Sequence, residues 1–105
     1  QLLAKLRRLR FVDDAEFARR WVENRRRLKA TSTKKLRLEL REKKVNSEVI
    51  QTVLAEDETD EHQLLRDLVE KKRRISRYQD DQKLMMYLAR QGFTYDDIKA
   101  ALARD

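Results

Sequence analysis

The chain contains no cysteine and no proline, and only one glycine among its 105 residues. The lack of cysteine excludes disulfide frameworks, thiolate nucleophiles and cysteine-based metal sites. A single glycine also excludes the glycine-rich loops that cradle phosphates in nucleotide-binding proteins. No apolar stretch approaches the roughly 20 residues needed to cross a bilayer, and no segment resembles a signal peptide. These absences predict a cytoplasmic protein with no membrane partner.

What remains is a highly charged chain of helix-forming residues. Charged residues make up 43% of the sequence and hydrophobic residues 40%, which is enough apolar material for a modest core. Leucine, alanine, arginine, lysine and glutamate dominate, whereas the residues that strand turns require are nearly missing. The composition therefore predicts an all-α fold.

Apolar residues at helical spacing divide the chain into amphipathic segments. One helix is predicted to begin at Asp13, which can cap its free amides, and to turn Phe17 and Trp21 toward a core. A second helix is predicted after residues 31–33 and a third after Asn46. Three helices of this kind form one compact unit.

The same pattern then recurs 48 residues later, which indicates a repeat. The predicted organisation is all-α, with tandem three-helix-bundle repeats forming an elongated, curved array. Residues 1–11 are assigned to the last helix of a preceding, truncated repeat, residues 12–57 to a middle repeat and residues 58–105 to a C-terminal repeat. The positions that coincide include Leu36 with Leu84, Leu40 with Leu88, Ile50 with Ile98 and Leu54 with Leu102.

The repeat also predicts the core and the helix ends. Gly92 is expected to end a helix in the left-handed conformation, and Lys44 to do so at the matching position with more strain. The side chains expected to be buried are Phe17, Trp21, Leu36, Leu40, Ile50 and Leu54 in the first unit and Leu65, Leu68, Leu84, Leu88, Ile98 and Leu102 in the second.

Residues that could carry catalysis are few. His62 is the only histidine and has no cysteine or serine partner at a recognisable spacing, so it is interpreted as a solvated surface residue. The paired carboxylates, such as Asp96 with Asp97, stand at predicted helix starts, where they stabilise the helix dipole. We predict no catalytic, cofactor-binding or metal site, no small-molecule substrate and no enzyme activity. Tyr95 is the best candidate for an exposed aromatic side chain.

Basic residues are the feature that points to a partner. Residues 1–53 hold 16 basic and 7 acidic side chains, and residues 54–105 hold 10 and 12. With Leu36 and Leu40 turned inward, Lys34, Arg37 and Arg41 share the outer face of their helix without acids at i±4. Residues 71–82 are interpreted as a frayed helix end and a mobile basic loop. The charge pattern favours an anionic partner, either nucleic acid or an acidic protein surface.

Several motifs resemble those of the RecX family. The segment 11–18 (FVDDAEFA), followed by Trp21-Val22 and an arginine-rich run, resembles the family signature that opens the middle repeat. The segment 34–45 (KKLRLELREKKV) is similar to the family's second helix and the turn after it, and 91–98 (QGFTYDDI) to the pattern of its last repeat. Lys44 replaces the usual glycine of that turn, and Val12 the usual leucine of the signature.

The resemblance implies a non-enzymatic regulator of the bacterial recombinase RecA. Such a protein lies in the groove of the RecA filament on DNA and limits filament growth, ATP hydrolysis, strand exchange and the repressor cleavage of the SOS response. RecA is the implied partner, and single- or double-stranded DNA is a further candidate. The residues predicted to contact RecA or DNA are Lys34, Arg37, Arg41, Arg19, Arg20, Arg26, Arg27, Lys72, Arg73, Arg74 and Arg77.

Two other functions stay open at the level of the sequence. The first is a direct nucleic-acid-binding helical module, because the last two helices of each unit are similar to a helix-turn-helix. Against it, residues 46–55 contain no lysine or arginine, which a recognition helix in the major groove would need. The second is a purely structural scaffold.

Overall fold

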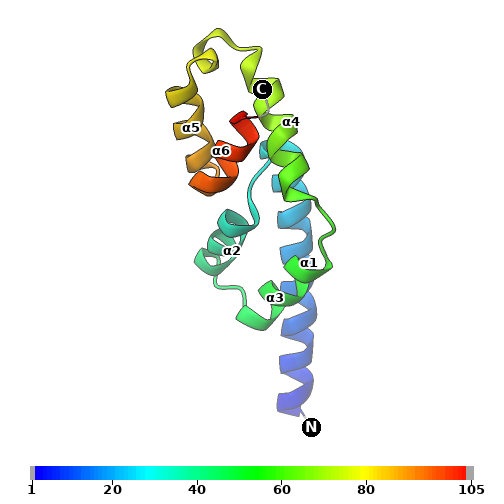
Figure 1. Cartoon of the computed structure of the whole chain (residues 1–105). Helices are drawn as coiled ribbons and strands as arrows, with labels where there is room; N and C mark the ends of the chain where they lie inside the picture. Colours follow the sequence, from blue (N-terminus) through cyan, green and yellow to red (C-terminus); the bar gives the residue numbers. More distant parts are fainter. Residues whose placement is uncertain (1, 104–105) are drawn as a thin grey trace. The chain divides into compact units, whose positions relative to one another are not determined.

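A computed structural model describes residues 2–103, and these residues form α-helices joined by short connections, with one short 3-10 helix (Figure 1). The predicted all-α class is confirmed, and the helices form two compact three-helix units. The elements are α1 (Leu2–Lys29), α2 (Thr33–Glu42), α3 (Ser47–Glu56), α4 (Glu61–Arg73), η1 (Ser76–Gln79), α5 (Asp81–Arg90) and α6 (Tyr95–Ala103).

The first unit comprises residues 2–29 and 36–58, in which α3 packs along α1 and α2 closes the core. Leu36 and Leu40 of α2 are fully buried, as are Ala18 of α1 and Val49 of α3. Burial of one such leucine contributes about 1.5–3 kcal/mol to stability. The carboxamide of Asn46 caps α3 by accepting a hydrogen bond from the Glu48 amide at 2.8 Å, which confirms the helix start predicted there.

The second unit comprises residues 30–35 and 59–103 and contains α4, η1, α5 and α6. Its core is formed by Leu65 and Val69 of α4, Leu84 and Leu88 of α5 and Ile98 of α6, all nearly inaccessible to solvent. The segment before α2 belongs here because its backbone is tied to the end of α5. The Ser32 amide donates to the Gln91 carbonyl at 3.2 Å, and the Lys35 ammonium donates to the Arg90 carbonyl at 2.8 Å.

The predicted core is confirmed except at Phe17. Leu36, Leu40 and Ile50 are buried in the first unit, and the leucines and Ile98 predicted for the second unit are buried or partly buried. Trp21 and Leu54 are partly buried against the first core. Phe17, however, is 43% exposed and stacks on the Trp21 ring with the centroids 6.0 Å apart.

The prediction that a helix begins at Asp13 is wrong, because α1 starts at Leu2 and continues through this residue. Residues 2–12 are mostly leucine, arginine, alanine and lysine without glycine or proline, so nothing interrupts the backbone hydrogen bonds before Asp13. A capping residue marks a helix start only where the preceding residues are not helical. The assignment of residues 1–11 to a preceding repeat stays a prediction.

The two predicted left-handed helix ends are confirmed. Lys44 has a φ of 63° and Gly92 a φ of 98°. A Cβ atom on Gly92 would lie 2.1 Å from the Ser32 hydroxyl oxygen, so this position needs glycine for its space as well as its backbone. Ala30, at the end of α1, also has a positive φ of 50°, which the sequence did not indicate.

Candidate partner-binding surface

A strip of three basic residues covers the outer face of α2. Lys34, Arg37 and Arg41 are exposed, and none of them forms an ion pair within residues 2–103. Leu38 is 54% exposed in the same helix. We call Lys34, Arg37 and Arg41 the α2 strip. Cations that are neither paired nor buried are available for an external anion.

The arginines of α1 that were predicted as contacts are largely engaged within the first unit. The Arg26 guanidinium donates to the Asp57 carboxylate at 3.0 Å, and the Arg26 side chain is only 9% exposed. Arg19 donates to Glu56 at 3.0 Å, and Arg20 to Glu16 at 2.6 Å.

Within residues 2–103, the Arg27 guanidinium donates one side-chain hydrogen bond, to the Asn24 side chain at 3.4 Å. The structure therefore gives Arg26 a part in holding α1 against the end of α3, whereas the Arg27 guanidinium remains at the surface.

Electrostatics reinforce the contact between Arg19 and Glu56. The hydrogen bond from the Arg19 guanidinium holds the pKa of the Glu56 carboxyl below its ordinary value of 4.5. The same contact raises the pKa of Arg19. Both side chains are exposed, so the pair is screened by salt and contributes modestly to stability.

The basic segment after α4 is more ordered than predicted. Residues 76–79 form the helix η1, so the prediction of an irregular loop there is wrong. Arg73 fixes this segment by donating to the Gln79 carbonyl at 3.1 Å and to the Asp81 carboxylate at 2.6 Å. The sequence did not predict η1, because polar contacts of the Arg73 side chain stabilise this segment and no periodic apolar pattern marks it.

Two tyrosines organise the remaining cations of this segment. The rings of Tyr78 and Tyr87 lie 5.2 Å apart, and the Lys72 ammonium sits 4.7 Å from the Tyr87 centroid. The Arg77 guanidinium lies 5.7 Å from the Tyr78 centroid. Arg74 lies 3.6 Å from Glu70, one turn earlier in α4. Lys72 and Arg77 thus keep charge near the surface while contacting aromatic faces.

A polar network beside the α2 strip was not predicted. The Glu39 carboxylate accepts hydrogen bonds from the Trp21 indole at 3.0 Å and from Arg25 at 3.1 and 2.5 Å. The Lys43 ammonium lies 4.7 Å from the Trp21 ring centroid. Glu39 of α2 therefore pairs with Arg25 of α1. Only the three-dimensional fold brings Glu39 to α1, 14 residues away from Arg25.

An open hollow lies between α2 and α3. It has a volume of about 280 Å³, and Arg37, Arg41, Ser47, Ile50 and Gln51 line it. Its two charged residues are both members of the α2 strip. The sequence predicted the exposed face of Arg37 and Arg41 but not the polar residues of α3 that stand opposite.

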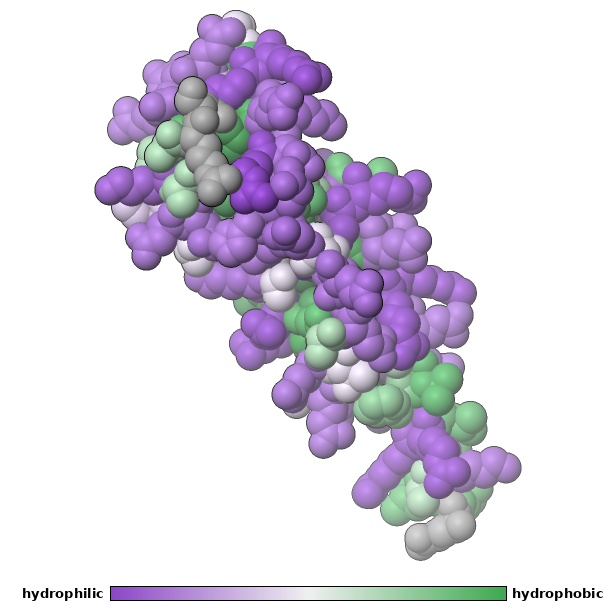
Figure 2. All heavy atoms as spheres, turned by 45° about the vertical axis from the view of Figure 1, so that its right-hand side comes forward, coloured by the Kyte–Doolittle hydropathy of each residue, from purple (hydrophilic) through white to green (hydrophobic). Residues whose placement is uncertain are grey.

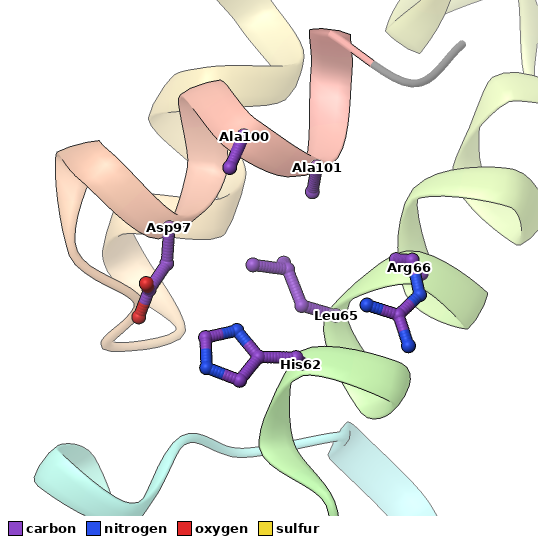
Figure 3. A pocket seen from close by; sticks show the side chains of 6 residues that line it. All are labelled: His62, Leu65, Arg66, Asp97, Ala100 and Ala101. Atoms are coloured by element: carbon purple, nitrogen blue, oxygen red, sulfur yellow. The ribbon is translucent and has the colours of Figure 1, made fainter.

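A second hollow, of about 220 Å³, lies between α4 and α6 (Figure 3). His62 and Arg66 come from α4 and Asp97 from α6, while Ala100 and Ala101 of α6 face Leu65. His62 is exposed, as predicted. Within residues 2–103, no group of three histidine, cysteine or carboxylate side chains is arranged to hold a metal ion.

The face that Figure 2 shows is mostly hydrophilic, and apolar side chains gather at its lower right. These apolar side chains lie near the N-terminal end of α1, where Leu2, Leu3, Leu6 and Leu9 are between 53% and 73% exposed. Tyr95, at the start of α6, is 62% exposed, which confirms its predicted exposure.

Across the described residues, no helix is both long and apolar enough to span a membrane.

The fold and this surface define an all-helical repeat protein with an exposed row of cations on one helix, α2. Comparison with known proteins gives the family. The model of the second three-helix domain of RecX matches residues 13–54, and the model of the third three-helix domain matches residues 58–102. The chain belongs to the RecX family, so the predicted resemblance is confirmed.

Several curated relatives carry the name "Regulatory protein RecX". The protein of Amycolatopsis mediterranei is 39% identical over 97 residues, which cover 88% of this chain and 55% of the relative. That of Mycobacterium leprae is 36% identical over 104 residues, covering 93% and 61%, and that of Mycobacterium avium is 37% identical over 99 residues, covering 89% and 57%. The chain thus spans little more than half the length of these relatives. No solved structure matches it.

Proposed function

We propose that this chain is a negative modulator of RecA that binds in the groove of the RecA–DNA filament. In this role it limits filament growth, ATP hydrolysis, strand exchange and the co-protease activity of the SOS response. It acts in the cytoplasm without catalytic activity of its own. Residues 1–11 belong to the last helix of a preceding repeat, and residues 12–57 and 58–105 are the two repeats that follow.

The observation that carries the proposal is the α2 strip. Three cations share one helix face, and no acidic side chain of the described residues neutralises them. A protein surface rich in carboxylates, or DNA phosphate beside it, would supply the missing counter-charge. In the first unit Arg27 adds an exposed cation, whereas Arg26 supports the fold. The second unit carries its own exposed cations next to η1, Arg74 and Arg77.

A direct nucleic-acid-binding module of the helix-turn-helix type is the second candidate. The surface does not favour it, because α3, which would be the recognition helix, contains no lysine or arginine over Ser47–Glu56. The third candidate, a purely structural scaffold, does not explain why the cations of the α2 strip have no acidic partner among the described residues.

Inhibition of RecA tests the proposal directly. The chain should reduce ATP hydrolysis by RecA on single-stranded DNA, and the inhibition should weaken as salt screens exposed charges. A triple variant with Lys34, Arg37 and Arg41 changed to glutamate should lose most of this inhibition. A matched variant with exposed cations of the second unit changed to glutamate (Lys83, Arg90 and Lys99) should retain it.

Circular dichroism melts of both variants check that neither unfolds. If the α2 variant inhibits as well as the parent chain at moderate salt, the strip only solubilises the helix and the proposal fails at this surface.

A further inference from the structure

The hollow between α2 and α3 is built from two helices that contribute different chemistry. Arg37 and Arg41 stand one turn apart on α2, and Ser47 and Gln51 stand one turn apart on α3. Ile50, which is 3% exposed, forms the apolar wall between them and anchors α3 in the first core. The polar groups are therefore attached to elements that packing holds in place.

The lining offers hydrogen-bond donors and positive charge without an acidic side chain. Each guanidinium presents five N–H donors in a planar fork, the serine hydroxyl adds one donor and the glutamine amide two. Neither Arg37 nor Arg41 forms an ion pair within residues 2–103. Such a site is suited to an anion that carries several acceptor oxygens.

We propose that this hollow binds a phosphate of the nucleic-acid backbone. A single arginine fork satisfies a carboxylate in bidentate fashion, so a carboxylate would leave the second guanidinium unused. A phosphodiester, with a neighbouring phosphate along the strand, can engage both forks together with the hydroxyl and the amide. The inference rests on the proposed function, in which the partner filament carries DNA, and it assigns Arg37 and Arg41 to the DNA rather than to RecA.

Comparison of the two repeats shows that the fold does not require these arginines. At the offset of 48 residues that aligns Leu36 with Leu84 and Leu40 with Leu88, the counterparts of Arg37 and Arg41 are Met85 and Ala89. The counterparts of Ser47 and Gln51 are Tyr95 and Lys99. The second unit thus builds its three-helix core without the two arginines, so the fold does not account for their presence in the first unit.

The spacing of the two arginines also disfavours a purely structural role. Like charges at i, i+4 on a helix repel each other, and no acid at i±4 relieves this pair. An anion bound between them would remove the repulsion. Phosphate in the hollow should therefore raise the melting temperature of the chain, whereas removal of the arginines should not lower it.

The repeat itself supplies the test variant. In the double variant Arg37→Met and Arg41→Ala, each new residue is the one that the second unit carries at the matching position. The control variant, Lys83→Gln and Arg90→Gln, removes the same charge from α5, where both side chains are exposed. Binding of each chain to a fluorescein-labelled oligothymidylate is measured by fluorescence anisotropy over a range of salt concentrations, without RecA.

The parent and control chains should bind with similar affinity, and the double variant should bind about tenfold more weakly. The slope of log affinity against log salt should become shallower by about 0.7 for each phosphate contact that is lost. Equal affinity and equal slope for the double variant and the control would overturn the inference, as would a parent chain that does not bind the oligonucleotide.

Binding to RecA without DNA separates this inference from the proposed function. If the double variant loses DNA binding but still binds RecA, both stand. If it keeps DNA binding and loses RecA binding, the hollow takes a carboxylate of the protein partner and the phosphate site is refuted. If the parent chain binds DNA through the hollow but never binds RecA, the proposed function fails while the phosphate site remains.

Discussion

Replacing Glu39 with alanine is expected to destabilise the first unit by about 2–4 kcal/mol. The carboxylate accepts one hydrogen bond from the Trp21 indole and two from the Arg25 guanidinium. Hydrogen bonds to a charged group contribute about 1.5–3 kcal/mol each, and breaking a fully buried ion pair costs about 3–5 kcal/mol. The side chains of Arg25 and Glu39 are 25% and 15% exposed, so water compensates part of the loss and lowers the expected cost.

The assay is urea unfolding followed by tryptophan fluorescence. Trp21 is the only tryptophan, so its signal reports on the first unit. Glu39→Gln should cost roughly half as much as Glu39→Ala, because the amide oxygen still accepts from the indole but no longer neutralises Arg25. The control is Glu42→Ala, which removes an exposed acid from the same helix and should change stability by about 0.5 kcal/mol or less. If the alanine variants of Glu39 and Glu42 unfold at the same urea concentration, the network does not stabilise the unit.

Three further outcomes are expected. Gly92→Ala should lower the melting temperature measured by circular dichroism, because the positive φ alone costs about 1–3 kcal/mol and the new Cβ would meet a hydroxyl oxygen at 2.1 Å. Lys44→Gly should raise it by the equivalent of about 0.5–1 kcal/mol, since relief of the left-handed strain exceeds the entropy that glycine adds to the unfolded chain. Because Arg19 lowers the pKa of Glu56 in the folded state, this pair stabilises the chain above pH 4.5, and the contribution is lost as the pH falls through the lowered pKa. Glu56→Gln should therefore reduce the loss of stability on acidification in melts recorded from neutral to acidic pH, and an unchanged pH dependence would show that the contact is not formed in solution.

The sequence predicted the helical framework because the framework depends on short-range patterns. Leu36 and Leu40 stand at i, i+4 spacing, as do Leu84 and Leu88, and all four are buried because this spacing places each pair on one helix face. The start of α1 was missed because Asp13 satisfies a capping pattern while the residues before it are also good helix formers. Helix propensity alone cannot decide between a helix that begins at Asp13 and one that continues through it, because no glycine or proline interrupts residues 2–12.

The surface was harder to predict because exposed arginines look alike in a sequence. Arg26 and Arg27 are neighbours, yet Arg26 is half-buried and paired with Asp57, whereas Arg27 is exposed and donates to Asn24. The difference arises from a residue 31 positions away, at the end of α3. Arg37 and Arg41 could be recognised as outward-facing from their spacing to the inward leucines, but the opposing wall of the hollow on α3 required the packed structure.

The two repeats use one matching position for opposite purposes. Met85, the counterpart of Arg37, packs against the second core, where a guanidinium would have to be desolvated without a partner. Arg37 stands at the same place in a helix whose outer side opens onto the polar hollow, so its charge stays hydrated. The core leucines of the two repeats therefore maintain the same fold, whereas the position of Arg37 and Met85 carries a charge in the first unit and packs against the core in the second. A charged contact with the partner can thus be confined to the first unit without any change in how the second unit folds.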